Sequence, residues 1–271
     1  MTIWCGVDEA AHSVDDGAWL APGGFMLGRA PMALVLALIR AGRRDLRMLS
    51  LPNPLPAELL VAAGAATRVE LLFNALTLAN RVWSMPAMKR AIEAGRIAWV
   101  EHDGYRVVQR LRAAAMGLPF IPAPDADASE VATLDPPAYA VDPFTGARVP
   151  VERAFHPDVA LVHAQAADDA GNLYLEDPTT DLLVIAAAHR VIATAEVRVR
   201  ALPRVTVPAF QVERVCEAPG GAWPTGCVGH YPHDEAALLA YLTGGDAAQA
   251  AWLAAAVARA PGVPEPARGA A

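Results

Sequence analysis

The N-terminal residues best suited to bind a ligand are two adjacent glycines, Gly23 and Gly24, with Phe25 and Arg29 close behind. Adjacent glycines let the backbone approach a ligand closely and expose N–H groups to an oxyanion or a phosphate. Arg29 would add positive charge. The glycines lie between a predicted strand and a predicted helix, which is where open α/β sheets bind ligands. The alternative is a plain turn whose glycines serve only the backbone.

A second group consists of Glu101, His102 and Asp103, which follow another predicted strand. Carboxylates beside an imidazole can shift its pKa toward neutrality, and such a group can act in acid/base catalysis. Asp103 is also well placed to cap a helix that begins near residue 105. The residues alone leave both roles open.

A third group has metal-ligating side chains, Cys227, His230 and His233, at intervals of three residues. They could bind zinc if a fourth ligand came from elsewhere in the chain, but their spacing matches no common closed zinc site. Gly229 and Pro232 also prevent a helix that would place them on one face. We therefore predict no metal site.

Further polar residues lie at the ends of predicted strands. His163 and Gln165 follow residues 159–162, where a buried, hydrogen-bonded histidine at the strand end is favoured over a catalytic one. Glu196 follows an apolar segment and Glu217 precedes a glycine pair. The sequence shows no partner for either glutamate.

Short apolar segments alternate with helical segments, the βαβ rhythm of a parallel sheet. The expected strands are residues 17–21, 47–51, 68–73, 98–101, 159–163, 173–175 and 191–195. The expected helices are residues 31–42, 86–94, 105–116, 180–189, 234–243 and 246–260, several of them marked by an initial proline or a following glycine. The pattern predicts an α/β fold with an open, mainly parallel β-sheet flanked by helices.

One segment interrupts this rhythm. Residues 122–150 are rich in Pro, Asp and Ala, and residues 142–146 are expected to form a hairpin turn. We interpret the segment as an excursion within a single domain of residues 1–260. Residues 261–271 lack apolar periodicity and are expected to form a frayed tail.

Composition excludes several classes of protein. The formal net charge is −7, which disfavours nucleic-acid binding. Although 54% of the residues are hydrophobic, apolar stretches such as residues 32–39 are too short to span a membrane. The high content of hydrophobic residues instead predicts a large subunit interface. Three cysteines without a CxxC motif, and no leader-like N-terminus, predict a cytoplasmic protein. Signatures of dinucleotide, P-loop, zinc-protease and serine-hydrolase sites are absent.

Four groups of residues occur in an order that carries a resemblance. They are Gly23–Phe25 with Arg29 and Pro31, residues 113–122, residues 158–165 with Gly171, and residues 217–222 followed by Tyr231 and Asp234. Over roughly residues 12–242 the chain resembles the α (A) subunit of class I CoA-transferases. It is most similar to the α chain of glutaconate CoA-transferase and to that of a related steroid-degradation CoA hydrolase.

The resemblance implies an α subunit that pairs with a β subunit to form the active site at their interface. In such enzymes a glutamate of the β chain attacks an acyl-CoA, and an acceptor carboxylate resolves the resulting thioester. The sequence context of that glutamate is absent here, so this chain is expected to hold no nucleophile. Coenzyme A is implied as substrate, with a dicarboxylic or oxo acid and no metal or redox cofactor.

The resemblance also implies which residues contact the acyl-CoA, with backbone donors stabilising negative charge. They are Gly23, Gly24, Phe25, Arg29, and Asn74 and Thr77 from an expected loop at residues 74–83. In the hydrolase branch an acidic residue aligned with Asp103 looks catalytic, so a CoA-thioester or ring-opening hydrolase subunit is one alternative. A non-catalytic ligand-binding protein of the same fold is a second.

Overall fold

The structure of the chain is a computed structural model that describes residues 2–124, 130 and 135–259. The expected tail at 261–271 lies outside these residues. Within them, no helix is long and apolar enough to span a membrane.

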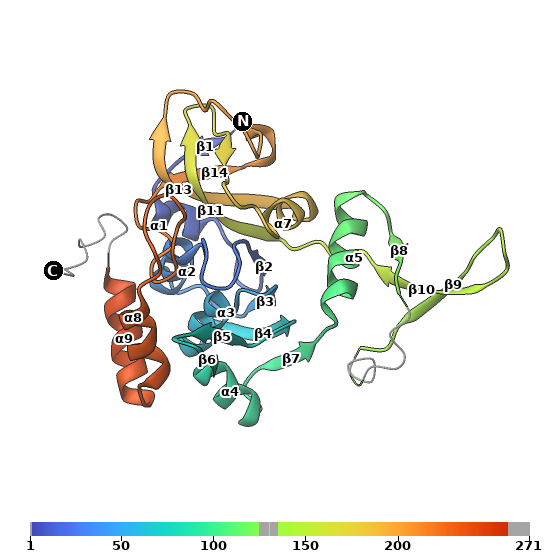
Figure 1. Cartoon of the computed structure of the whole chain (residues 1–271), viewed down its shortest axis with the longest axis horizontal. Coiled ribbons are helices and arrows are strands. Elements are labelled where there is room, and N and C mark those ends of the chain that lie inside the picture. Colours follow the sequence, from blue (N-terminus) through green and yellow to red (C-terminus); the bar gives the residue numbers. More distant parts are fainter. Residues whose placement is uncertain (1, 125–129, 131–134, 260–271) are drawn as a thin grey trace.

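A nine-stranded sheet forms the centre of the molecule (Figure 1). Its strands are β1 (Ile3–Trp4), β2 (Trp19–Pro22), β3 (Leu46–Ser50), β4 (Ala66–Leu71), β7 (Ala98–Glu101), β11 (Val159–Asp168), β12 (Leu173–Tyr174), β13 (Arg190–Val199) and β14 (Arg214–Glu217). Their order is β1-β14-β13-β11-β2-β3-β4-β7, and every pair along it is parallel. Only β12, which pairs with β11 at the side, is antiparallel. The predicted open parallel sheet is confirmed.

Helices cover both faces of the sheet. One face packs against α1 (Val7–His12), α2 (Met32–Arg40), α3 (Pro54–Ala62), α4 (Pro86–Glu93), α8 (Glu235–Thr243) and α9 (Asp246–Ala258). The other face packs against α5 (Gly104–Ala115) and α7 (Asp181–Ala187). Helix α2 is apolar almost all round because it is enclosed: Met32 to Leu38 are all buried. Helix α3 lies between the strands expected at 47–51 and 68–73, where a helix was expected without stated bounds, and its first turn contains two prolines.

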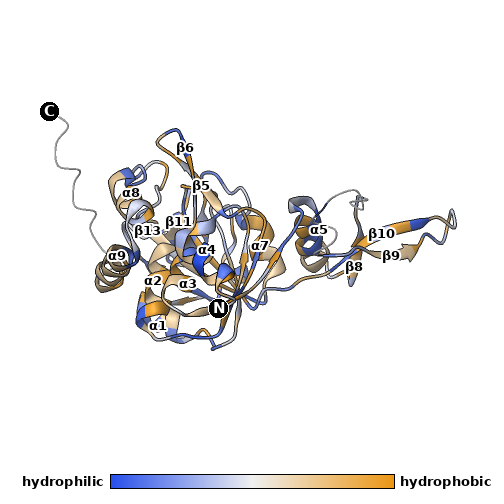
Figure 2. Cartoon of the chain, turned by 90° about the horizontal axis from the view of Figure 1, so that it is seen from below, coloured by the Kyte–Doolittle hydropathy of each residue, from blue (hydrophilic) through white to orange (hydrophobic). Residues whose placement is uncertain are grey.

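The excursion after α5 forms a small antiparallel sheet, which we call the arm. It consists of β8 (Phe120–Pro122), β9 (Ala138–Val141) and β10 (Arg148–Arg153), in the order β8-β10-β9. The predicted hairpin turn at residues 142–146 is confirmed, since the Phe144 N–H donates to the Asp142 carboxylate at 2.9 Å. The hairpin extends away from the nine-stranded sheet (Figures 1 and 2).

Two expectations about local structure are wrong. Residues 74–83, expected as a loop, form a hairpin of β5 (Ala75–Leu78) and β6 (Arg81–Ser84). Its two turn residues, Ala79 and Asn80, have φ angles of 50° and 57°, which a two-residue hairpin turn requires. The strand expected to end near residue 163 continues to Asp168, so His163 and Gln165 lie within β11 rather than after it.

The direction of the chain connections reverses between β2 and β11. From β2 the chain passes through α2 to β3 on one side, whereas β11 borders β2 on the other side. This reversal is the switch point where open α/β sheets bind ligands.

Candidate functional site

The turn after β2 lies at this switch point, and its backbone N–H groups form hydrogen bonds to other groups of the same chain. The N–H of Gly23 donates to the Leu161 carbonyl at 2.8 Å, and that of Gly24 to the Asp181 carboxylate at 3.0 Å. The Phe25 N–H donates to the Gly28 carbonyl. The backbone donors expected for an oxyanion are therefore occupied in this chain. Phe25 is exposed at the surface.

Only glycine fits at position 24. Its φ angle is +81°, and a Cβ atom there would lie 2.6 Å from the carbonyl oxygens of Gly28 and Arg29. A Cβ at Gly23 would lie 2.2 Å from a carboxylate oxygen of Asp181. The glycines thus let the backbone pack against α7 and against the turn itself.

Arg29 is 1% exposed and points into the protein. Its Nε donates to Asp177 at 2.7 Å, and one terminal nitrogen donates to Asp181 at 2.8 Å and to the Asp177 carbonyl. The other terminal nitrogen donates to the His163 carbonyl and to Asp181. Burial alone would lower the pKa of Arg29, but the two aspartates raise it. All five N–H donors are used, so Arg29 fixes the turn to α7 rather than offering charge directly to a ligand.

His163 lies on β11 just beyond the end of β2 and is completely buried. Its Nε2 lies 2.6 Å from the Glu196 carboxylate, and its Nδ1 lies 2.8 Å from the Thr194 hydroxyl. Burial lowers the pKa of His163 in spite of Glu196, so the ring is neutral and its Nε2–H donates to the carboxylate. The predicted buried, hydrogen-bonded histidine is confirmed.

Glu196 is the acceptor at the centre of this network. It also accepts the Gly220 N–H at 2.7 Å and the Tyr231 hydroxyl. Burial raises the pKa of Glu196, but the hydrogen bonds from His163 and Tyr231 outweigh it and lower the pKa. These partners are more than 20 positions away, which explains why the sequence showed none. Glu217, by contrast, is exposed, and within the described residues it accepts only a long hydrogen bond from the Arg198 N–H.

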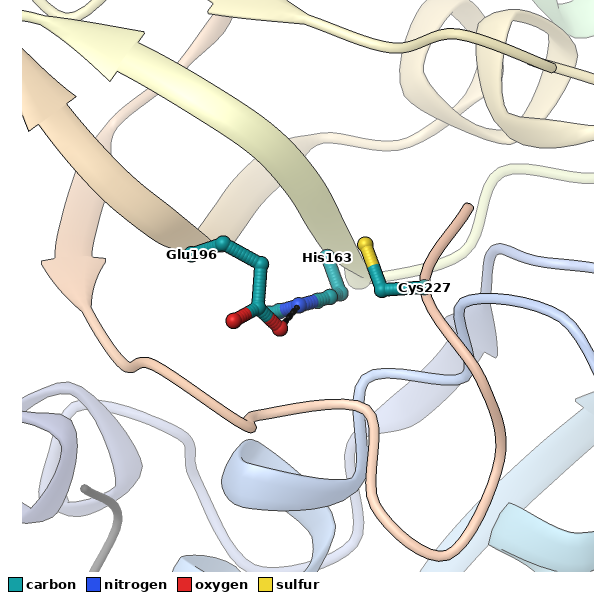
Figure 3. Close-up of side chains that lie close together, drawn as sticks. All are labelled: His163, Glu196 and Cys227. Carbon is teal, nitrogen blue, oxygen red and sulfur yellow. Dashed lines mark hydrogen bonds and ion pairs between the residues drawn. The ribbon is translucent and has the colours of Figure 1, made fainter. Parts of the chain in front are cut away.

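Cys227 completes a trio with His163 and Glu196 (Figure 3). One ligand atom of each lies within 4.8 Å of the other two. The structure thus brings Cys227 to His163 and Glu196, and not to His230 and His233. Burial raises the pKa of the Cys227 thiol to about 12. A metal there would have to displace the thiol proton and the His163–Glu196 hydrogen bond, so the trio is first a hydrogen-bonded unit.

A pocket of about 470 Å³ opens in front of this network. Its walls are Leu27 and Gly28 from the first turn and residues 226–233 from the last loop. The two walls are joined by backbone bonds, from the Arg29 N–H to the Gly226 carbonyl at 2.7 Å and from the Gly226 N–H to the Leu27 carbonyl at 2.8 Å. Gln165, which donates to the Val228 carbonyl at 3.4 Å, ties β11 to the same loop. Sequence reasoning missed this pocket.

Two asparagines follow the neighbouring strands. Asn53, beyond β3, is fully buried and donates through Nδ2 to the Gly23 carbonyl at 2.6 Å. Its Oδ1 and that of Asn74, beyond β4, have no hydrogen-bond partner in the described part of the chain. A buried acceptor without a donor is costly, so these oxygens are suited to a donor from outside the chain. Asn74 was expected at the site and Asn53 was not. Thr77 lies exposed on β5.

Asp103 caps α5, as the sequence allowed. One carboxylate oxygen accepts the Tyr105 N–H at 3.0 Å and the Arg106 N–H at 3.1 Å, and the side chain is otherwise exposed. Its neighbour His102 is buried between two carboxylates, Glu70 and Asp135, each at 2.9 Å. The structure therefore separates Asp103 from the imidazole expected to act with it.

Arginines of α5 extend the cluster around His102 into the arm. Arg106 and Arg110 both pair with Glu152 on β10, and Arg110 also pairs with Asp135 at 2.5 Å. Burial alone would lower the pKa of His102, but its hydrogen bonds to Asp135 and Glu70 raise it. The cluster therefore joins β4, the start of α5 and the arm through charged groups.

Comparison with known proteins gives consistent matches. The sequence profile of the family described as Coenzyme A transferase matches residues 6–218. The chain is 32% identical over 246 residues to a cholesterol ring-cleaving hydrolase IpdA subunit of Rhodococcus jostii, with 84% of this chain and 82% of that one aligned. It is 29% identical over 259 residues to the A subunit of glutaconate CoA-transferase of Acidaminococcus fermentans, with 86% of this chain and 80% of that one aligned.

Solved structures extend the comparison. A crystal structure of a variant of the decarboxylase AibA/AibB contains a chain 62% identical to this one, with a TM-score of 0.93. The match covers 95% of this chain and 99% of that one. An uncharacterised protein of Archaeoglobus fulgidus is 30% identical over 244 residues, which are 87% of this chain, but the chain spans only about half of its length (54%).

Proposed function

Because the chain belongs to the Coenzyme A transferase family, we propose that it is the α subunit of an enzyme that acts on an acyl-CoA and forms its active site with a second chain. The reaction that we favour is decarboxylation of an acyl-CoA that carries a second carboxyl group. One observation carries this choice. The chain is 62% identical to a chain of a decarboxylase over nearly its whole length, but only 29% and 32% identical to the transferase and hydrolase subunits.

The pocket supplies surroundings that suit this chemistry. In a decarboxylation the bond to the carboxyl carbon breaks, carbon dioxide leaves, and the electron pair moves toward the thioester carbonyl before a proton restores the carbon. A carboxylate loses carbon dioxide more readily when its water is removed. Leu27, Val228 and Pro232 provide apolar walls, and the imidazole groups of His230 and His233 line the same pocket.

The arrangement of buried carboxylates supports a second chain. Asp181 and Glu196, at the switch point, already hold several donors each, so neither is available as a nucleophile. A reaction that needs a nucleophilic carboxylate would therefore take it from the second chain. The free Oδ1 atoms of Asn53 and Asn74 can accept N–H groups of that chain or of the pantetheine arm of CoA.

CoA transfer is the second candidate, since it is the reaction of the glutaconate CoA-transferase to which this chain is similar. It requires a nucleophilic glutamate on the partner and an acceptor acid. The thioester of such a glutamate would be trapped by hydroxylamine. Decarboxylation requires neither an acceptor acid nor that intermediate.

One assay distinguishes the reactions. The chain is purified from its own host, native mass spectrometry identifies a stoichiometric second subunit, and the complex is incubated with glutaconyl-CoA and acetate. We expect the acyl-CoA to lose the mass of carbon dioxide without a requirement for acetate. Acetyl-CoA as the product would replace this proposal by CoA transfer, free CoA would replace it by hydrolysis, and a chain that forms only homo-oligomers would contradict the second-chain site.

A pocket variant connects the reaction to this chain. Val228 is 56% exposed in the pocket wall, so Val228→Arg should fill the pocket without disturbing the core. We expect kcat/KM to fall by about 100-fold. The matched control is Val205→Arg, a valine that is 45% exposed and does not line the pocket. Equal activity of the two variants would show that the pocket is not part of the site.

A further inference from the structure

Two of the three cysteines meet at the edge of the sheet, far along the chain from each other. The sulfur atoms of Cys5 and Cys216 lie 3.7 Å apart. Both are free thiols, and Cys5 is partly exposed whereas Cys216 is completely buried. Neither belongs to the pocket or to the hydrogen-bonded network around Glu196.

Strand register holds the two cysteines side by side. Strands β1 and β14 are parallel neighbours in which Ile3 pairs with Arg214 and Trp4 with Val215. The next pair in this register is Cys5 and Cys216, and the Cys5 N–H donates to the Val215 carbonyl at 3.1 Å. Neighbouring strands lie about 4.8 Å apart, which falls within the Cα separations that a disulfide spans.

We propose that Cys5 and Cys216 are a redox modification site, which a peroxide oxidises to a disulfide and a small thiol reduces again. The Cys5 sulfur attacks the peroxide, the O–O bond breaks, one oxygen stays on sulfur as a sulfenic acid and the other leaves as water. The Cys216 sulfur then attacks the Cys5 sulfur, the S–O bond breaks, and a second water leaves with the Cys216 proton. In total two thiols give up two electrons to one hydrogen peroxide.

The surroundings assign different roles to the two thiols. Solvent reaches Cys5, so the peroxide reacts there first. Burial and the neighbouring Cys5 raise the pKa of the Cys216 thiol, which protects it from direct oxidation. Its sulfur lies 3.7 Å from that of Cys5, so Cys216 is the thiol placed to attack a sulfenic acid on Cys5. The disulfide would bind a two-residue edge strand covalently to β14 and close a loop of about 210 residues, which restricts the unfolded chain strongly.

The test uses the full chain, treated with a small excess of hydrogen peroxide and then alkylated under denaturing conditions. We expect the intact mass to fall by two hydrogens, one alkylatable thiol to remain, and a peptide map to show Cys5 joined to Cys216. The oxidised protein should melt about 5 °C higher, and dithiothreitol should reverse both changes. Sulfinic acid at Cys5 with Cys216 still alkylatable would overturn the proposal, as would dimers linked through Cys5.

Variants assign the reaction to this pair. Cys227→Ser should form the disulfide as the natural chain does, and Cys5→Ser should leave Cys216 reduced at the same dose of peroxide. Cys5 is only partly buried, so its serine variant keeps the experiment interpretable even if Cys216→Ser fails to fold. A disulfide that forms equally in Cys5→Ser, through Cys227, would also contradict the proposal.

Discussion

Two buried histidines belong to the same sheet region, one within β11 and one directly after β7, and their pKa values are shifted in opposite directions. His163, beside β13, contacts one carboxylate, and burial lowers its pKa. His102, beside β4, loses solvation as well, but it lies between Glu70 and Asp135, and its pKa is raised. His163 is completely buried and has one carboxylate, whereas His102 is less completely buried and has two, so both the smaller loss of solvation and the second carboxylate favour the protonated form of His102.

The opposite pKa shifts reflect two different kinds of network around the two histidines. The network of His163, Thr194, Glu196 and Tyr231 has a neutral ring and one charge, and it forms a fixed backing to the pocket. The cluster around His102 is built from ion pairs that reach into the arm. The network around His163 is held by neutral donors in fixed geometry. The stability of the cluster around His102 depends on the protonation of that ring.

The largest effect is expected from a substitution that disrupts the network around His163. Glu196→Ala removes the acceptor of three donors, from His163, Gly220 and Tyr231, and leaves them without partners in a buried site. We expect the free energy of unfolding, measured with urea, to fall by about 3 kcal/mol. The exposed Glu217→Ala is the control and should change it by less than about 0.5 kcal/mol. A similar small loss in both variants would contradict the central role of Glu196.

The second largest effect is expected when one carboxylate is removed from the cluster around His102. Glu70→Gln leaves His102 with Asp135 alone, which makes its surroundings resemble those of His163. We expect the pKa of His102, followed by NMR titration of the ring, to fall below its value in the natural chain, and stability at neutral pH to decrease by about 1 kcal/mol. Glu93→Gln, on the exposed side of α4, should leave the titration of His102 unchanged. An unaltered pKa in Glu70→Gln would show that Asp135 suffices.

The two histidines should give opposite pH dependences between pH 5.5 and 8. The folded pKa of His163 lies below the ordinary 6.5, so its contribution is complete above pH 6.5 and is lost as the pH falls. The folded pKa of His102 lies above 6.5, so its contribution is complete below pH 6.5 and is lost as the pH rises through that folded pKa. Each slope is at most about 1.4 kcal/mol per pH unit.

The measurement is the urea midpoint across that pH range for the natural chain, His102→Gln and His163→Gln. His102→Gln should lose the decline on the alkaline side, and His163→Gln should lose the decline on the acidic side. The same pH profile in all three proteins would contradict the opposite charge states.

The smallest effect concerns the residue next to His102. Asp103→Asn preserves a good helix cap, so the free energy of unfolding should change by less than about 0.5 kcal/mol. Turnover by the complex should also be unchanged if Asp103 only caps α5. A loss of turnover at unchanged stability would instead support the hydrolase alternative.

Local signals predicted the parallel sheet and most of its elements. Residues 98–101 were predicted as the strand that the structure shows, and the helix expected at 86–94 is α4, because Pro86 and Gly95 mark its two ends. A helix was expected between the strands at 47–51 and 68–73, but its bounds were not; the prolines at 54 and 56 both lie in the first turn of α3, where proline fits. Such features depend on residues close together in the chain.

The site could be predicted only in part. His163 and Gln165 were interpreted as the end of a strand because they are polar, but Thr194 and Glu196 on β13 satisfy His163 inside the sheet. Arg29 was expected to face a ligand, and its two aspartates lie about 150 positions away. No pattern among neighbouring residues in the sequence predicts partners at such a distance along the chain. The two glycines correctly indicated the turn after β2. They gave no information about the groups that accept hydrogen bonds from the N–H groups of that turn.

The walls of the pocket have a consequence for how the chain folds. Leu27 and Gly226 are 199 positions apart, yet they bond directly across the pocket, and neither wall has the same support without the other. Contacts between such distant positions form late, because the chain between them must be ordered first. During synthesis most of the core can assemble before residue 226 has left the ribosome. Binding capacity should therefore appear only when nearly the whole chain has been made.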